Sequence, residues 1–234
     1  MIKRLLIILI IMHCFAIPVI AQEKLVFSTV QPSPIVTVCE NVVKEAYQRI
    51  GVDVQVIKYP AARALKMAES GKTDGELFRI AGLDQRFKNL IMIPLSVYTM
   101  EGVAVTKGIS FPVTGRESLK PYKVGRVFGV IWAEKFAKGL NEHGVHDNET
   151  LITVLDKGRV DVILASRLTL LSVTKKFDIK DFKVLSPPIA SIPLYHYLNK
   201  RHEALVPRIT SAVQEMEKTG RIKEIKEEMA ASLQ

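Results

Sequence analysis

Cysteine is nearly absent from this chain, and its scarcity limits the chemistry and the covalent stabilisation available. Two cysteines occur in 234 residues, Cys14 and Cys39. Cys14 lies in an apolar N-terminal segment that we expect to be removed, so the mature chain would keep one cysteine and no intramolecular disulfide. Cys39 stands in an apparent helix without a recognisable catalytic context, which favours a small buried hydrophobic residue over a nucleophile. The fold must therefore rely on an ordinary apolar core.

Motifs for metal, nucleotide and redox chemistry are also missing. The sequence contains no Walker-type phosphate loop, no HExxH pair and no CxxC pair. His143 and His146 stand on either side of Gly144 in a segment that we interpret as a solvated loop, because metal ligation needs converging ligands. We therefore expect neither a cofactor nor a metal site.

Long hydrophobic runs are limited to one, at the N-terminus. Lys3 and Arg4 precede the apolar stretch 5–20, and Ala21 follows it with the small side chain that signal peptidases accept. The run is shorter than the roughly 20 residues that span a bilayer. These features predict a signal peptide over residues 1–21, cleaved after Ala21; the alternative is an uncleaved membrane anchor.

The charge balance is basic, with a formal net charge of +9. Without Lys3 and Arg4 the mature chain keeps a charge of +7, which suits an anionic ligand, an acidic partner or a negatively charged membrane surface. Acidic residues alternate with the basic ones along the helical segments, as in 218–227. That pattern is typical of a solvated face, so we expect no nucleic-acid partner.

One short motif occurs twice, as Gly71-Lys72-Thr73-Asp74 and as Gly158-Arg159-Val160-Asp161. Each copy follows a helical stretch and precedes an apolar run. Glycine supplies the left-handed conformation that ends a helix, so each copy predicts a helix turning directly into a buried strand. Two such units predict two α/β lobes of similar build, with a ligand cleft between them.

The hydrophobic periodicity predicts an α/β fold in which strands and helices alternate. Ser33 is the expected N-cap of a helix that begins with Pro34. Strands are predicted at 24–30, 52–57, 74–80, 89–93, 98–107, 122–128, 160–165, 182–185 and 192–198. Helices are predicted at 35–50, 60–71, 130–143, 149–157, 168–176, 200–219 and 222–232.

Together these features resemble bacterial extracellular solute-binding protein family 3, the periplasmic substrate-binding proteins of polar amino-acid ABC transporters. Residues 64–107 follow the family pattern without gaps, including Asp84-Gln85-Arg86 and Val103-Ala104-Val105, and 205–222 resembles the family's last two helices. The resemblance implies a two-lobed periplasmic-binding-protein-like fold of type II. Each lobe would be a mixed sheet flanked by helices, and two crossing strands near 101–105 and 190–195 would form the hinge.

The resemblance also implies the domain organisation and the function. Residues 22–100 and 200–234 would form lobe 1, and residues 101–199 would form lobe 2. The protein would be a monomeric periplasmic receptor that captures a small solute and delivers it to an ABC permease in the inner membrane, without enzymatic activity. Two alternatives stay open: a periplasmic enzyme of the cyclohexadienyl dehydratase type, with Glu134 as its candidate acid or base, and a ligand-sensing domain without a transporter.

Three arginines are candidate anion contacts. Arg86 matches the family arginine that binds the ligand carboxylate. The alternative interpretation is a surface arginine on a turn. Arg79 lies in an otherwise apolar strand that would face the cleft; we favour it slightly over Arg86, and the rival interpretation is a structural ion pair with Glu76. Arg63 opens a helix beside the same cleft, where the helix dipole does not favour a cation, but it could also face solvent.

The chain departs from the family at the amino-acid contacts. The aspartate that would bind the ligand ammonium is Ser166, and Gly129 is followed by Val130 where a hydroxyl residue is usual. An anionic or partly apolar ligand, held by arginines and by Trp132, Tyr195 or Tyr197, fits better than an amino-acid zwitterion, with Tyr197 favoured as a core residue. The predicted ligand-binding set is Arg79, Arg86, Arg63, Ser33, Gly129, Trp132, Ser166 and Tyr195.

Overall fold

The structure, a computed structural model, describes residues 24–177 and 181–233. The predicted signal peptide at 1–21 lies outside these described residues. Within them, none of the helices combines the length and the apolar character needed to cross a bilayer.

Strands and helices alternate as predicted from the periodicity. The strands are β1 (Lys24–Thr29), β2 (Asp53–Lys58), β3 (Gly75–Arg79), β4 (Leu90–Lys107), β5 (Lys123–Val127), β6 (Asn141–Val145), β7 (Val162–Ser166), β8 (Phe182–Val184) and β9 (Ala190–Asn199). The α-helices are α1 (Pro34–Arg49), α2 (Ala61–Glu69), α3 (Ile131–Ala137), α4 (Asn148–Asp156), α5 (Arg167–Phe177), α6 (Val206–Lys218) and α7 (Arg221–Ser232). Among the described residues, 3₁₀ helices lie at Leu83–Gln85, Arg116–Leu119 and Lys200–Leu205.

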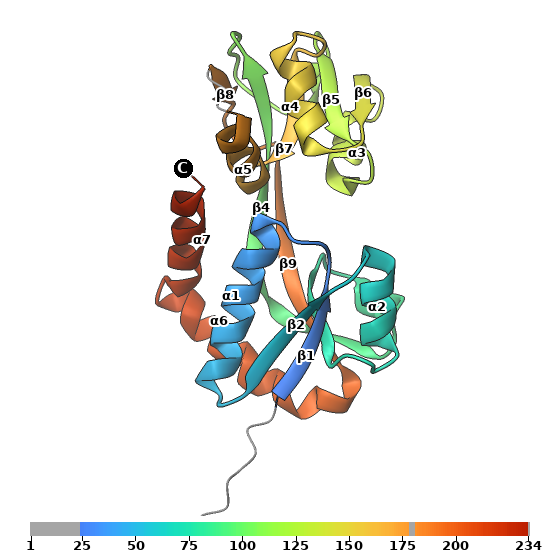
Figure 1. Cartoon of the computed structure of the whole chain (residues 1–234), viewed down its shortest axis with the longest axis vertical. Coiled ribbons are helices and arrows are strands. Elements are labelled where there is room, and N and C mark those ends of the chain that lie inside the picture. Colours follow the sequence, from blue (N-terminus) through green and yellow to red (C-terminus); the bar gives the residue numbers. More distant parts are fainter. Residues whose placement is uncertain (1–23, 178–180, 234) are drawn as a thin grey trace, which may run out of the picture.

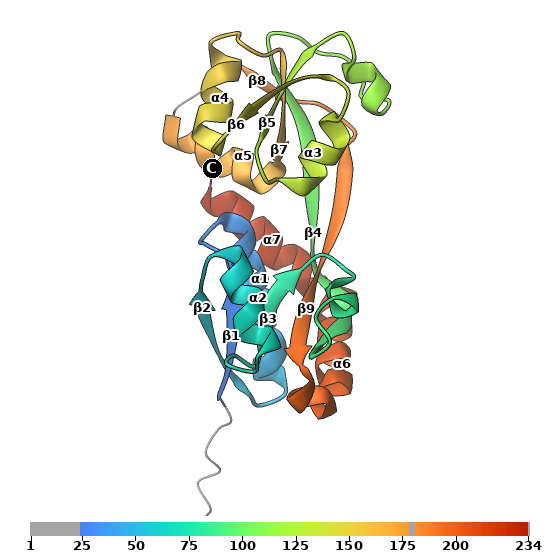
Figure 2. The same cartoon turned by 90° about the vertical axis from the view of Figure 1, so that its right-hand side faces the viewer.

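Two long antiparallel strands, β4 and β9, join the two lobes of the molecule (Figures 1 and 2). In the described residues the strand order is β2-β1-β3-β9-β4-β7-β5-β6, with β8 beside β4. β1, β2 and β3 pair in parallel at one end, and β5, β6 and β7 pair in parallel at the other. The middle of the order is antiparallel, through β3–β9, β9–β4 and β4–β7. The two-lobed α/β fold with two crossing strands is therefore confirmed.

Each lobe has its own apolar core, and Leu168 and Leu171 of α5, from lobe 2, also pack against the core of lobe 1. In lobe 1, α1 packs between the sheet and α6 and α7, and residues such as Phe27, Val42 and Met216 are buried there. In lobe 2, the sheet β4–β7–β5 is buried on both faces by two separate clusters, one including Leu155 and the other Leu164. Buried apolar area of this extent is the main source of stability in the described part of the chain, where Cys39 is a free cysteine.

The exact lobe boundaries remain a proposal. The buried residues change from the lobe 1 cluster to the lobe 2 clusters between Tyr98 and Val103, which supports a crossing near residue 101 on β4. On β9, Leu194 and Leu198 pack with lobe 1. We therefore propose that lobe 2 ends near Ala190, where β9 pairs with Gly102 within the predicted crossing at 190–195, and not at residue 199.

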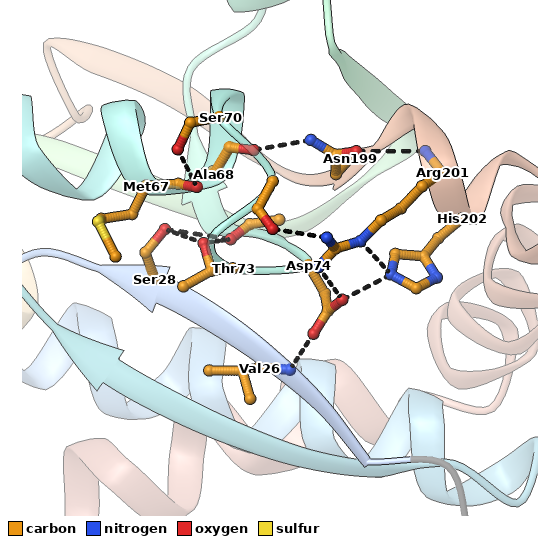
Figure 3. A network of polar contacts seen from close by, with 12 residues as sticks. Val26, Ser28, Met67, Ala68, Ser70, Thr73, Asp74, Asn199, Arg201 and His202 are labelled. Atoms are coloured by element: carbon orange, nitrogen blue, oxygen red, sulfur yellow. Dashed lines mark hydrogen bonds and ion pairs between the residues drawn. The ribbon is translucent and has the colours of Figure 1, made fainter.

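The repeated motif forms the same turn in both lobes. Gly71 and Gly158 adopt left-handed conformations, with φ of 71° and 64°. The carboxylate of Asp74 accepts a hydrogen bond from the backbone N–H of Val26 (2.7 Å), as Figure 3 shows, and that of Asp161 accepts one from Lys123 (2.8 Å). Each aspartate thus ties the turn to the neighbouring parallel strand, which confirms the predicted pair of helix–turn–strand units.

Three predicted elements need correction. The helix predicted at 130–143 ends at Ala137, because the chain turns at Gly139 (φ 80°) and then pairs with β5 as β6. The strands predicted at 89–93 and 98–107 are one strand, β4, whose pairing with β9 shifts register on both sides of Ser96. The helix predicted at 200–219 begins as a 3₁₀ helix and becomes α-helical only at Val206, followed by Pro207.

Candidate functional site

A cleft of about 1020 Å³ lies between the two lobes. Lobe 1 contributes the end of β3, the turn that follows it, and Ile35 of α1. Lobe 2 contributes the start of α3, the end of β7, and Thr169 of α5. β4 and β9 form its base through Met100 and Ile192. The cleft is therefore bounded by both lobes and by the two strands that join them.

Arg79 lines the cleft and is also part of an ion pair. Its guanidinium lies 2.6 Å from the carboxylate of Glu76, which is fully buried, and donates to the backbone oxygen of Ala61 (3.2 Å). Ser28 donates a hydrogen bond to the other oxygen of Glu76 (2.7 Å). Both interpretations of Arg79 thus have support in the geometry, because the same side chain faces the cleft and holds a buried acid.

The carboxyl group of Glu76, which pairs with the cleft-lining Arg79, has a raised pKa. Burial raises the pKa of Glu76 to about 7, and the nearby charge of Arg79 and the Ser28 hydrogen bond only partly oppose that effect. Glu76 therefore changes its charge near neutral pH, beneath a cleft-lining arginine.

Arg86 also lines the cleft, directly after the 3₁₀ turn Leu83–Gln85. Its guanidinium lies over the ring of Phe87, 5.5 Å from the ring centroid, and is exposed. Among the described residues, no carboxylate pairs with it. Arg86 is therefore a cleft-facing cation whose N–H donors are available to a ligand.

The wall from lobe 2 is built by the turn at Gly129 and by α3. Gly129 has a φ of 78°, and its N–H donates to the carboxylate of Glu134 (2.9 Å). Trp132 lies against the backbone of Gly102 on β4: a β-carbon at Gly102 would come within 2.7 Å of the indole ring. The ring of Trp132 therefore rests on one of the two connecting strands, where it would sense a movement of the lobes.

Ser166 lines the cleft, but its hydroxyl caps the N-terminus of α5. It is largely buried, and its hydroxyl accepts a hydrogen bond from the backbone N–H of Thr169 (3.3 Å) and contacts the Thr169 hydroxyl (3.1 Å). This is the geometry of an N-cap for α5. A neutral hydroxyl bound in this way supplies no negative charge to the cleft.

Three predicted residues lie outside the lining of this cleft. Ser33 caps α1 by accepting from the N–H of Val36 (3.3 Å) and borders a separate groove next to the start of α4. Arg63 lies over the ring of Tyr59, 5.3 Å from its centroid. Tyr195 pairs with Arg79 across β3 and β9 and packs beside Tyr197, whose hydroxyl donates to the backbone oxygen of Ile80 (2.8 Å).

The structure therefore brings together Arg79, Arg86, Gly129, Trp132 and Ser166 of the predicted set. Whether they bind a ligand stays a prediction. Tyr197, which the sequence favoured as a core residue, is fully buried. His143 does not lie in the predicted solvated loop but in β6, because this segment pairs with β5, and His146 follows the strand. In the part of the chain that the structure describes, no three metal-ligating side chains converge.

Sequence reasoning missed several lining residues, and Lys135 is the most important. It is an exposed side chain on α3, and the described residues offer it no ion pair. Its position four residues after Ile131 and three after Trp132 places all three on one helix face. This spacing could have identified Lys135 from the sequence, because Trp132 was already one of the predicted ligand-binding residues.

The charged residues that line the cleft are all positive. They are Arg79, Arg86 and Lys135, and among the described residues that line the cleft none is acidic. Most of the other side chains are apolar: Ile35, Leu65, Phe78, Ile80, Leu83, Met100, Val127, Val130, Ile131, Trp132, Leu164, Ile192 and Leu194. Ile80 and Ile131, from opposite lobes, are 52% and 55% exposed. The cleft is thus an apolar space with positive charge on both walls.

No protein-family model matches the chain. A protein of Shewanella oneidensis described as uncharacterized is 29% identical over 204 residues, which cover 83% of this chain and 76% of that protein.

Solved structures show the same fold at low sequence identity. A substrate-binding protein of an amino acid ABC transporter from Streptococcus pneumoniae, bound to L-arginine, has a TM-score of 0.66 and 17% identity, covering 90% of this chain and 95% of that one. The GluR0 ligand-binding core in complex with L-glutamate has a TM-score of 0.71 and 14% identity, with coverage of 90% and 99%. A histidine kinase sensor domain similar to periplasmic binding proteins has a TM-score of 0.67 and 14% identity, with coverage of 89% and 96%. The fold of this chain is therefore that of two-lobed periplasmic binding proteins.

Proposed function

We propose that this protein is a solute-binding receptor that captures a small anionic or amino-acid-like molecule between its lobes and delivers it to an ABC importer. The observation that carries the proposal is the cleft, which is lined from both lobes and from the two connecting strands. A ligand that contacts both walls stabilises the closed arrangement over the open one, which is how a hinged protein converts binding into a shape change.

The comparisons support this proposal at the level of the fold. The S. pneumoniae protein is a substrate-binding protein of an amino acid ABC transporter, and the GluR0 neighbour is a ligand-binding core. By analogy with these proteins, we propose that this chain is a monomeric periplasmic receptor and that its partner is a permease in the inner membrane. The N-terminal segment of the sequence, with Lys3 and Arg4 before an apolar run, supports export.

A sensing role is the second candidate, because one structural neighbour is a histidine kinase sensor domain. Both roles use the same ligand-driven closure and differ in the protein that reads it. The genes next to this one distinguish them: an adjacent permease and ATPase would favour import, and an adjacent histidine kinase would favour sensing.

A catalytic role has less support. Glu134, the candidate acid or base, accepts from the N–H of Gly129 and lies 3.3 Å from the guanidinium of Arg126. Both contacts hold the carboxylate at the base of the turn, where it fixes Gly129. A general acid or base must instead reach the substrate proton within hydrogen-bond distance. We therefore propose a binding role and no reaction.

A ligand screen on the purified protein tests the receptor proposal. Thermal unfolding is measured with amino acids, dicarboxylates, aromatic acids and small peptides, and a ligand at 100 times its dissociation constant should stabilise the native state by about 2.7 kcal/mol. The fluorescence of Trp132, the single tryptophan of the chain, reports closure in the same samples. A stabilising ligand that changes this emission supports the proposal. A ligand that stabilises the protein without changing the emission, and that binds equally well after Arg86→Ala, would place binding elsewhere and contradict it.

A further inference from the structure

The charges of the cleft define a narrower class of ligand, an inference that rests on the proposed receptor function. We propose that the cleft takes an organic acid with an apolar body and no ammonium group, whose anionic end is held between Arg86 of lobe 1 and Lys135 of lobe 2. The argument uses four features of the cleft: its missing acid, its two unpaired cations, the engaged Arg79, and its apolar walls.

The missing acid argues against a zwitterion. An ammonium group moved out of water needs an acidic or several neutral acceptors at hydrogen-bond distance. The described lining residues include no carboxylate, and the hydroxyl of Ser166 already accepts the N–H of Thr169. A ligand ammonium would instead lie among Arg79, Arg86 and Lys135, where each cation raises its energy.

Arg79 is less suited than Arg86 to take the ligand anion. A ligand carboxylate on Arg79 would compete with Glu76, whose buried oxygen lies 2.6 Å from that guanidinium. Breaking a buried pair leaves a charge without compensation, which is strongly unfavourable. Arg86 has no such competitor among the described residues, and its planar guanidinium can hold a carboxylate with two parallel hydrogen bonds.

Lys135 makes the anion a condition for closure. It lines the opposite wall from Arg86 and, like Arg86, pairs with no carboxylate in the described part of the chain. When the lobes approach, two like charges move closer in a space that loses water, so their repulsion grows. An anion between them reverses the sign of the interaction, and the closed form then becomes the more stable one.

The apolar walls define the rest of the molecule. Ile80 and Ile131 face the same cleft from the two lobes and are each more than half exposed. Trp132 adds an aromatic surface on the lobe 2 side. Closure around an apolar ligand body would remove these side chains from water, which favours association. The cleft volume of about 1020 Å³ also lies at the upper end of the range for pockets that hold small organic molecules.

Matched ligands that differ only in the ammonium group test the proposal. The probes are 3-phenylpropanoate with L-phenylalanine, indole-3-propanoate with L-tryptophan, 4-methylpentanoate with L-leucine, and glutarate with L-glutamate, each titrated calorimetrically against the purified protein. In at least one apolar pair, the acid without the ammonium should bind about 10–100-fold more tightly, the range that one unsatisfied charged group costs. Glutarate, which lacks an apolar body, should bind more weakly than the best apolar acid.

Variants then locate the anion. Arg86→Ala and Lys135→Ala should each weaken the best acid about 10-fold or more, as expected for a lost charged hydrogen bond. Lys138→Ala is the matched control, because Lys138 is an exposed lysine three residues further along that does not line the cleft. Circular dichroism checks that each variant remains folded. A loss that is equal in Lys135→Ala and Lys138→Ala would overturn the assigned role of Lys135.

The outcomes separate this inference from the receptor proposal. If the amino acids bind more tightly than their matched acids and change the Trp132 emission, the ligand class is wrong while the receptor function stands. If neither member of any pair binds, the ligand class is overturned, and the broader screen described above still decides the receptor function. Tight binding of the acids that Arg86→Ala and Lys135→Ala leave unchanged would also overturn the proposal.

Discussion

The two copies of the Gly–x–x–Asp turn have the same backbone geometry and different surroundings. In both lobes the glycine is left-handed and the aspartate accepts an N–H from the neighbouring parallel strand. In lobe 1, Asp74 also contacts Arg201 and His202 of the segment that follows β9 (Figure 3). Arg201 in turn donates to the backbone oxygen of Gly71. In lobe 2, the exposed Asp161 has no corresponding ion pair among the described residues.

This difference follows from the path of the chain. Lobe 1 is completed by a segment that returns through β9 after the whole of lobe 2, so it needs a contact that fixes the returning segment. The Asp74 network supplies it, together with Asn199, which donates to the backbone oxygen of Ala68 (2.8 Å). The repeated motif therefore reports how each lobe is built and not what the protein binds.

The largest effect is expected from removing the aspartate of lobe 1. Asp74→Ala leaves the N–H of Val26 without its acceptor and removes the carboxylate that pairs with the partly exposed Arg201 and with His202, and should lower the free energy of unfolding by about 2–3 kcal/mol. Asp161→Ala removes one backbone acceptor near the surface and should cost about 1 kcal/mol. Urea unfolding of the two variants measures both values. Equal losses would show that the ionic part of the lobe 1 network contributes nothing.

A pH titration sharpens the comparison, because lobe 1 holds a buried acid at its cleft wall. The pKa of Glu76 is raised by burial to about 7, so between its ordinary value of 4.5 and about 7 the unfolded chain has lost a proton that the folded chain keeps. Stability from this group is therefore complete below about pH 4.5 and is lost as the pH rises to about 7, in total about 3 kcal/mol.

The Glu76→Gln variant isolates this contribution. His196 acts in the opposite direction over part of the same range, because burial lowers the pKa of His196 to about 4 and the folded state then resists protonation as the pH falls. Asp74, whose pKa is lowered by hydrogen bonds from Val26, Arg201 and His202 in spite of its burial, adds stability that is lost in acid. The relevant measurement is thus the difference in unfolding free energy between wild type and Glu76→Gln, which should move in favour of the variant as the pH rises. A flat difference would contradict the raised pKa.

The junction between the lobes gives a smaller effect with a specific signal. In Gly102→Ala the new methyl group would meet the ring of Trp132, which must move, at a cost of about 1–2 kcal/mol. The emission of Trp132 should shift. Gly125→Ala in β5 is the control: its methyl group would crowd Ile163 and Leu151 in lobe 2 and should cost stability without changing the emission. If both variants leave the emission unchanged, Trp132 does not depend on its contact with β4.

Local signals in the sequence were sufficient where short-range physics decides the structure. Ser33 and Pro34 predicted the start of α1, and Gly71 and Gly158 predicted the ends of two helices, because capping and left-handed turns depend on a few neighbouring residues. The order of elements then gave the fold through its resemblance to a known family.

Long-range pairing decided the elements that the sequence missed. β6 contains Glu142, His143 and Gly144, which have little strand preference, and it is a strand because β5 lies beside it. Pro94 marks a break in the local pattern, yet β4 continues past it through register shifts in its pairing with β9. At the site, Arg79 was recognisable as a charge in an apolar strand, whereas Lys135 looks like any exposed helical lysine until both lobes are placed.

The smallest effect concerns the contact that links both lobes at the hinge. Glu101, on β4 where the lobes meet, lies 2.6 Å from Arg167 of α5 in lobe 2 and 2.8 Å from Lys226 of α7 in lobe 1. The hydrogen bonds from Lys226 and Arg167 lower the pKa of Glu101, so the bridge is charged at neutral pH. Since these side chains are partly exposed, Lys226→Ala should cost only about 0.5 kcal/mol of stability.

The same substitution should nevertheless change the equilibrium between open and closed lobes. A contact worth a few tenths of a kcal/mol is small against the stability of a domain but is comparable with the difference between two hinge positions of similar energy. Small-angle X-ray scattering of the ligand-free protein should therefore show a changed radius of gyration for Lys226→Ala. Lys223→Ala, which removes an exposed pair with Glu227 on the same helix, should not change it. If the two variants scatter identically, Glu101 holds α7 in place within lobe 1 and has no influence on how the lobes are arranged.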